Sequence, residues 1–208
     1  KELGSAEKHL GGVNGVAFFN NGASLATVST DQLVRLWDVP SLTEKGKLKI
    51  HRWRITSVSA SSDGAWIASA SEGGVIKFID ASGKEVGEVK GEEKPIVSVA
   101  FSPKAPVLAY ATESGKICFY DVSKMAGGAE STIPDETRAN SIAWSPDGKS
   151  VVAGCQDGKV YLLDVEKSAF QPVKMGHERP FLGVAFSPDG AWIASACMDR
   201  SVRLMRVK

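Results

Sequence analysis

Three histidines are the residues of this sequence with the widest chemistry, because an imidazole can bind a metal ion, move a proton or hold a hydrogen bond. His9, His51 and His177 each stand four residues before the first apolar position of a short apolar run. His9 and His51 are 42 residues apart, and His51 and His177 are three times 42 residues apart. This equal placement predicts that they lie in separate structural units and form hydrogen bonds there. We therefore expect no metal site.

The residues that resemble catalytic or nucleotide-binding motifs do not have the spacing that such motifs need. Gly148-Lys149-Ser150 resembles the end of a phosphate-binding loop, but Ala143 stands where that loop needs its first glycine. No nucleophile, base and orienting acid occur in a pattern that would bring them together, and the carboxylates recur in turns. The sequence thus predicts a protein without a cofactor and without enzymatic activity.

The elements that position these residues are repeated along the chain. The repeat is clearest at Trp37-Asp38, and its second position returns at intervals of 42, 41, 43 and 42 residues, as Asp38, Asp80, Asp121, Asp164 and Arg206. Seven residues earlier stand Asp31, Gly73, Ser114, Asp157 and Asp199, and two residues before those stand Ser29, Ser71, Thr112, Cys155 and Cys197. A constant period in this range indicates a repeat architecture.

With a His, a Ser or Thr, an Asp and a Trp-Asp pair per repeat, and Ser-Pro-Asp-Gly turns between strands, the chain resembles the WD40 repeat family over essentially its whole length. The resemblance implies that His9, Ser29, Asp31 and Trp37 form a structural hydrogen-bonded set in the first repeat. In the second repeat Gly73 and Ile79 replace the Asp and the Trp, and in the fifth Cys197 and Met205 replace the hydroxyl and the Trp.

The fold that we expect is all-β: a WD40-type β-propeller, with five four-stranded blades in this chain. Apolar residues at consecutive positions, as in Val184 to Phe186, suit strands covered on both faces. The fourth strand of each repeat is weakly marked, and we expect it at Lys47 to Ile50, Glu85 to Val89, Glu130 to Ile133 and Pro172 to Met175. The whole of 1–208 forms one propeller region, with repeats at about 9–50, 51–91, 92–134, 135–176 and 177–208.

The amino-acid composition limits the kinds of partner that we expect. A net charge of +1, from 25 basic and 24 acidic residues, gives no reason to expect direct binding to nucleic acid. No apolar stretch approaches 18 residues, so we expect no insertion into a membrane. Three cysteines are an odd number and do not indicate a disulfide framework, which favours an intracellular protein, in the cytoplasm or the nucleus.

Candidate binding residues follow from the repeat. The loops that bear the histidines and the turns that bear the aspartates are expected at the same end of every blade, so their variable residues form one top face. Trp53 is the exception to every repeat column, and arginines flank it; the alternative is that it folds back on a neighbouring blade. The predicted partner-binding residues are Arg52, Trp53, Arg54, Glu72, Glu113, Arg138, Gln156, Arg179 and Met198.

The presence of five repeats allows three interpretations of how the propeller ring is completed. The chain is part of a longer propeller, an array that another chain or missing blades complete, or a closed five-bladed ring in which residues 1–8 supply the last outer strand. We expect a protein-protein interaction scaffold that docks partner proteins within a multi-subunit assembly. The alternative is a peptide-recognition module that reads a short motif, modified or unmodified, on the top face.

Overall fold

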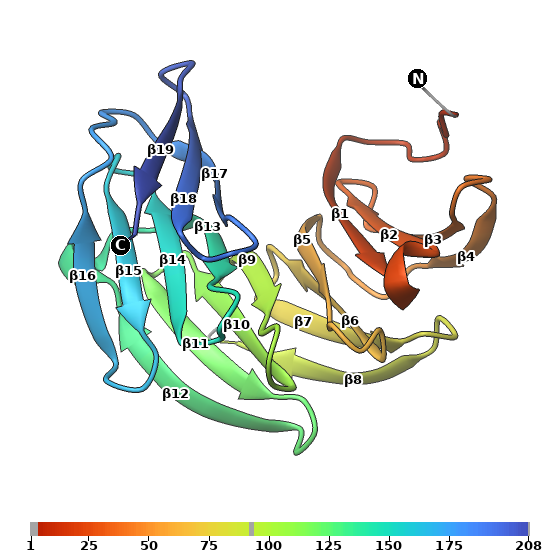
Figure 1. Cartoon of the computed structure of the whole chain (residues 1–208). Coiled ribbons are helices and arrows are strands. Elements are labelled where there is room, and N and C mark those ends of the chain that lie inside the picture. The colour runs from red at the N-terminus through yellow and green to blue at the C-terminus, as the bar shows by residue number, and fades with distance from the viewer. Residues whose placement is uncertain (1–3, 92–93, 208) are drawn as a thin grey trace. The chain divides into compact units, whose positions relative to one another are not determined.

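The computed structural model describes residues 4–91 and 94–207. The chain divides into two compact units, residues 1–96 and residues 97–208, and each is described by itself. Figure 1 shows that the strands of each unit form small antiparallel sheets. We call these sheets blades 1 to 5 in chain order. In the described residues no helix is long and apolar enough to cross a membrane.

The first unit contains blades 1 and 2, each a four-stranded meander in which neighbours in sequence pair. Blade 1 has β1 Val13–Phe19, β2 Ser24–Ser29, β3 Val34–Asp38 and β4 Glu44–Leu48. Blade 2 has β5 Ile55–Ala60, β6 Trp66–Ser71, β7 Val75–Asp80 and β8 Glu85–Lys90. Apolar side chains of both blades, among them Val28, Val58 and Ile67, form one buried core between the two sheets.

The second unit contains the other three blades, except that β9 starts at the last residue of the first unit. Blade 3 has β9 Ile96–Phe101, β10 Val107–Thr112, β11 Lys116–Asp121 and β12 Ala126–Thr132. Blade 4 has β13 Ala139–Trp144, β14 Ser150–Cys155, β15 Val160–Asp164 and β16 Ala169–Val173. Blade 5 has β17 Phe181–Phe186, β18 Trp192–Cys197 and β19 Val202–Arg206.

The expected fold class is confirmed: the chain is all-β, of the WD40 propeller type, with five blades. The expectation of four strands in every blade holds for blades 1 to 4, whereas blade 5 has three strands in the described residues. Residues 4–8 form no strand, and residues 1–3 lie outside the described residues. The closing role of residues 1–8 stays a prediction.

The outer strands begin earlier than the sequence suggested. β4 starts at Glu44, β12 at Ala126 and β16 at Ala169, three to four residues before the expected positions. The prediction was wrong because it followed apolar residues. These strands are largely exposed and are held by backbone pairing to β3, β11 and β15, which needs no apolar pattern.

Polar side chains fasten neighbouring blades within each unit. In the first unit, Asn14 Nδ2 donates a hydrogen bond to the carbonyl oxygen of Ile55, the first residue of the next blade, at 2.6 Å. In the second unit, Asn140 Nδ2 donates to the carbonyl oxygen of Phe181 at 3.1 Å. The backbone N–H of Val184 donates to Ser141 Oγ at 3.2 Å. One blade is thus placed on the next by directional bonds as well as by apolar packing.

Candidate functional site

The loops before the first strands meet the turns between the second and third strands. In four blades a backbone N–H of the turn donates to a backbone carbonyl of the loop, in the pairs Thr30 to Gly12, Glu72 to Arg54, Gln156 to Arg138 and Met198 to Pro180. The distances are 2.9 to 3.1 Å. In each of these blades the loop and the turn therefore form one surface at one end of the sheet, which we call the loop end.

In blade 1 a histidine, an aspartate, a threonine and a tryptophan form a chain of hydrogen bonds at the loop end. His9 Nδ1 lies 2.8 Å from Asp31 Oδ2, and His9 Nε2 lies 2.8 Å from Thr27 Oγ1. The indole Nε1–H of Trp37 donates to the same Thr27 oxygen at 2.8 Å. Because Thr27 accepts from Trp37, its own proton is donated to His9 Nε2, and His9 donates from Nδ1 to Asp31.

This arrangement corrects the predicted position of the hydroxyl, which is Thr27 and not Ser29. Both side chains are on the same face of β2, because residues two apart in a strand point the same way. Thr27 lies opposite Arg35, two pairs along the strands from the Leu25–Trp37 pair and on the same face, so the indole reaches it. Ser29 is at the end of the strand, where its Oγ accepts the backbone N–H of Asp31 at 3.1 Å and shapes the turn.

Asp31 is fixed from three directions. Burial acts to raise the pKa of its carboxyl group, but hydrogen bonds from His9 and from the backbone N–H groups of Leu10 and Leu33 outweigh that effect. The pKa of Asp31 is therefore lowered. The carboxylate joins the loop to the turn in its ionised form.

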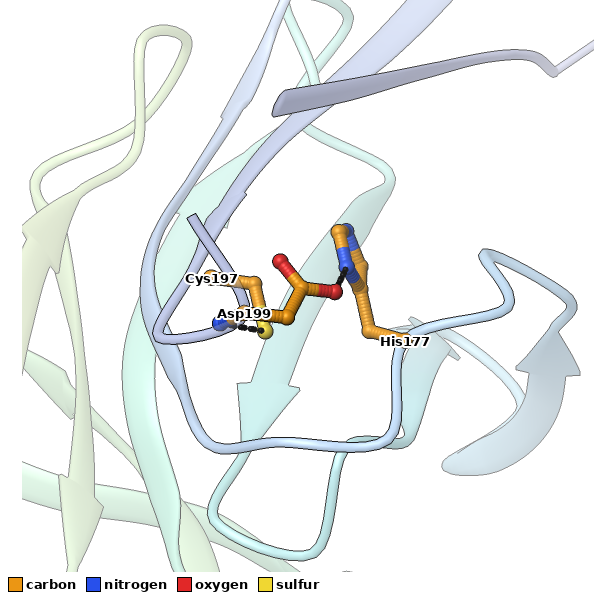
Figure 2. A group of neighbouring side chains, drawn as sticks. All are labelled: His177, Cys197 and Asp199. Atoms are coloured by element: carbon orange, nitrogen blue, oxygen red, sulfur yellow. Dashed lines mark hydrogen bonds and ion pairs between the residues drawn. The ribbon is translucent and has the colours of Figure 1, made fainter. Parts of the chain in front are cut away.

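Blade 5 repeats most of this network (Figure 2). His177 Nδ1 lies 2.6 Å from Asp199 Oδ2, and its Nε2 lies 2.9 Å from Ser195 Oγ. The same correction applies here, because Ser195 supplies the hydroxyl and Cys197 does not replace it. Hydrogen bonds from His177 and Ser201 hold the pKa of Asp199 well below its usual range.

Blade 2 keeps only the histidine and the hydroxyl. His51 Nε2 lies 2.8 Å from Ser69 Oγ, the residue equivalent to Thr27. Gly73 stands where blade 1 has Asp31. The indole of Trp53 lies against Gly73, so closely that a Cβ added there would collide with Trp53 Cδ1 and come within 2.9 Å of Nε1. The tryptophan thus takes the space that an aspartate side chain fills in blades 1 and 5.

Comparison with protein families agrees with these networks. The model for the WD domain, G-beta repeat, matches residues 1–38, 42–80 and 170–204, which together are more than half of the chain. The chain belongs to the WD40 repeat family. A second family model, the anaphase-promoting complex subunit 4 WD40 domain, matches residues 99–179. Comparison with curated proteins gave no match.

WD40 propellers are in general protein-interaction domains without enzymatic activity. The residues to examine for binding are therefore those whose side chains are exposed. In the first unit, Arg52, Trp53 and Arg54 are exposed, and 61% of the Trp53 surface is open. Arg54 Nε forms an ion pair with Glu72 at 2.6 Å. The structure thus brings together the four predicted partner-binding residues of this unit, with Trp53 against its own blade.

The predicted residues of the second unit lie on three blades. Arg138 forms an ion pair with Glu113 at 3.0 Å, which joins the loop of blade 4 to the turn of blade 3. Gln156 and Arg179 are exposed at the loop ends of blades 4 and 5, and 57% of the Met198 surface is open. Their role in binding stays a prediction.

The cluster that could hold a metal ion in the described residues is His177, Cys197 and Asp199, whose ligand atoms lie within 4.8 Å of one another (Figure 2). Each atom already has a partner. His177 Nδ1 meets Asp199, and Cys197 Sγ lies 3.1 Å from the carbonyl oxygen of Arg179. The cluster matches the His-Asp pair of blade 1, where the third position is Ser29, so the hydrogen-bonded network explains it in full.

One group of exposed apolar residues is not among the predicted site residues. It includes Leu182, Val202 and Leu204 of blade 5, which are 65%, 72% and 67% exposed. The signal that could have found the group is that a blade at the end of an open array leaves one face of its sheet uncovered. Their individual exposure could not be found from the pattern, because buried strands of the other blades show the same apolar runs.

Proposed function

We propose that this WD40 chain is a non-enzymatic scaffold that docks partner proteins within a multi-subunit assembly inside the cell. The observation that supports it best is the open apolar face of blade 5. Trp192, Val202 and Leu204 lie on that face and are 42%, 72% and 67% exposed. The pairing of Ala194 with Leu204 and of Ala196 with Val202 puts these side chains on the same side of the sheet.

The opposite face of blade 5 is covered by blade 4. Ile193 and Met205 pack there against Val152 and Val160 of blade 4, in a buried core. Contiguous exposed apolar surface on a soluble domain is typical of a binding site for another protein.

The polar residues that fasten one blade to the next are missing from this face. Asn140 and Ser141 of blade 4 bond to the backbone of blade 5, whereas the equivalent positions of blade 5, one repeat further along, are Leu182 and Gly183. Leucine and glycine side chains cannot form these bonds. The face therefore offers a partner mainly apolar contact.

The comparisons support an assembly in a second way. The family model that matches residues 99–179 describes a WD40 domain in a subunit of the anaphase-promoting complex. That match lies in the unit that bears the open face. The odd number of cysteines and the burial of Cys118, Cys155 and Cys197 support a reducing compartment.

The test is the native mass of the gently isolated chain and the identity of the subunits that co-purify with it. We expect the wild type to run in a complex well above its own 22.1 kDa. The double variant Val202→Asp, Leu204→Asp should run alone with an unchanged melting temperature. Lys167→Asp, at a lysine whose side chain is 75% exposed in blade 4, is the matched control and should keep the complex. A wild type that is a single folded species would refute the scaffold.

Peptide recognition is the second candidate function. One specific observation favours it, a pocket beside Trp53 in blade 2 with a buried histidine that lacks its usual partner. The pocket lies at the loop end, where the sequence placed the binding surface.

A further inference from the structure

A pocket of about 400 Å³ opens in the first unit beside the loop end of blade 2. Its lining includes His51, Trp53, Gly73, Lys77, Glu88 and Lys90. All of these residues belong to blade 2 or to the loop that leads into it. The pocket is therefore independent of the blade 5 face on which the scaffold proposal rests.

His51 has one ring nitrogen without a partner within the described residues. Only 4% of its surface is exposed, and its Nε2 is occupied by Ser69 Oγ. The other ring nitrogen, Nδ1, is not among the fully buried atoms that lack a hydrogen bond, so a ligand in the pocket can reach it. In blades 1 and 5 the same nitrogen meets a carboxylate oxygen, at 2.8 and 2.6 Å. The position that holds a carboxylate in two other blades is therefore open to one from a ligand here.

The missing carboxylate is the direct result of Gly73. The Trp53 indole lies in the space left by the absent side chain, yet 61% of its surface remains open. Its Nε1–H also has no hydrogen-bond partner in the described part of the chain. The pocket therefore presents the Nδ1 atom of His51 and the indole N–H of Trp53 next to an exposed aromatic face.

Charge in the pocket favours an anion. Arg52, Lys77 and Lys90 line it against one carboxylate, that of Glu88. Lys77 is largely satisfied, because its ammonium group lies 2.6 Å from both Glu85 and Glu88. Within the described residues Lys90 pairs with Glu88, at 3.3 Å, and its side chain is 76% exposed, which leaves donors for a further oxygen.

We propose that this pocket binds the side-chain carboxylate of a glutamate or aspartate in a partner peptide, which accepts from His51 Nδ1–H beside the Trp53 indole and so makes the bond that an aspartate of the chain makes in blades 1 and 5. Trp53 packs against an apolar neighbour of that acidic residue in the peptide. Lys90 lies at the mouth of the pocket and attracts the charge. The binding mode copies, with a ligand, the bond that Asp31 makes within blade 1.

A bound carboxylate selects the tautomer of His51 in which Nδ1 has the proton. In that tautomer Ser69 donates its hydroxyl proton to Nε2 at 2.8 Å, in the same order as the bonds of His9. Burial and the nearby Lys77 ammonium lower the pKa of His51 to about 4, so the ring is neutral at pH 7. A bound carboxylate stabilises the imidazolium form and so raises that pKa.

The test follows the ring signals of the three histidines by NMR in the intact chain. The probe is acetyl-leucyl-glutamate with an amidated C-terminus, and its control has glutamine in place of glutamate. We expect saturable shifts of the His51 signal with the glutamate probe, and at least tenfold weaker binding of the glutamine probe. The His9 and His177 signals should not move, because their Nδ1 atoms already meet carboxylates.

Two variants separate this site from general effects. Gly73→Asp supplies the carboxylate from the chain itself and, because its Cβ would collide with Trp53, also displaces the indole. It should weaken probe binding at least tenfold, with unchanged His9 and His177 signals. Gly127→Asp places the same side chain in open space and should bind as the wild type does. His51→Gln should also lose binding, and the melting temperature of each variant reports whether it is folded.

Several results would overturn the proposal. They are equal binding of the glutamate and glutamine probes, full binding by folded Gly73→Asp, or equal shifts at all three histidines. Preference for acetyl-leucyl-glutamine with a free C-terminus would show that a main-chain carboxylate is the ligand instead, which also contradicts the proposed side chain. None of these results depends on β19, so this site and the scaffold can fail separately.

Discussion

Thr27 Oγ1 accepts the indole proton of Trp37 at 2.8 Å and lies 2.8 Å from Nε2 of His9, so one hydroxyl group connects the core of blade 1 to its loop end. Trp37 is 3% exposed and Thr27 is 8% exposed. Both bonds are therefore shielded from water, and their loss leaves buried polar atoms without partners.

Replacement of Thr27 tests this relationship. We expect Thr27→Val to lower the free energy of unfolding by about 2 to 4 kcal/mol, because two buried hydrogen bonds lose their partner. Ser29→Ala removes a single bond to the backbone of Asp31 and should cost about 1 kcal/mol. Equilibrium urea unfolding of both variants measures the difference. If Ser29→Ala lowered the free energy of unfolding more than Thr27→Val does, Ser29 would provide the hydroxyl group of the network, as the sequence suggested.

Trp37→Ala should cost about 3 to 5 kcal/mol, because it leaves a large cavity in blade 1 and removes one of the two hydrogen bonds of Thr27. Trp192 is the matched control, since it is 42% exposed in blade 5. Trp192→Ala should change the free energy of unfolding by about 1 kcal/mol or less. Thermal unfolding followed by circular dichroism compares the two. If Trp37→Ala cost less than about 1 kcal/mol, the central role of this indole would be wrong.

His51 makes stability depend on pH. Its pKa is lowered from 6.5 to about 4, by burial and then by Lys77. Between these values the unfolded chain binds more protons than the folded chain. The free energy of unfolding therefore has its full value, as far as His51 is concerned, above pH 6.5 and falls as the pH is lowered toward 4. The loss across this window is roughly 3 kcal/mol.

The pH effect is measured as urea midpoints between pH 4 and 7. His51→Gln cannot titrate and should flatten the curve in this window, although its stability at pH 7 is lower. His9→Gln is the comparison, because His9 has a carboxylate partner and His51 has none. An unchanged slope in His51→Gln would show that other groups cause the dependence.

Cys155 should resist alkylation in the folded chain. Burial, and then the charge of Asp157, raise the pKa of its thiol to about 12, so almost no thiolate exists at pH 8. Intact mass spectrometry after treatment with iodoacetamide should show modification of Cys155 in urea but not in buffer. Met198→Cys, at a position that is 57% exposed, should react at once. Equal rates for Cys155 in urea and in buffer would contradict its burial.

The repeat pattern made the blades predictable because its signals are local. Turn residues such as Ser187-Pro188-Asp189-Gly190 punctuate the strands, and the central strands are apolar along their length. The outer strands β4, β12 and β16 were misplaced because their positions depend on the backbone of a neighbouring strand, which no local pattern reports.

The sequence by itself determined the period, the all-β class, the family and the positions of His9, His51 and His177. Only the tertiary structure decided that Thr27 and Ser195 provide the hydroxyl groups, because strand alternation puts Thr27 and Ser29 on the same face and only the path of the loop selects between them. It also decided that Trp53 fills the space above Gly73. That contact joins a loop to a turn twenty residues away, and its cause is the shape left by a missing side chain.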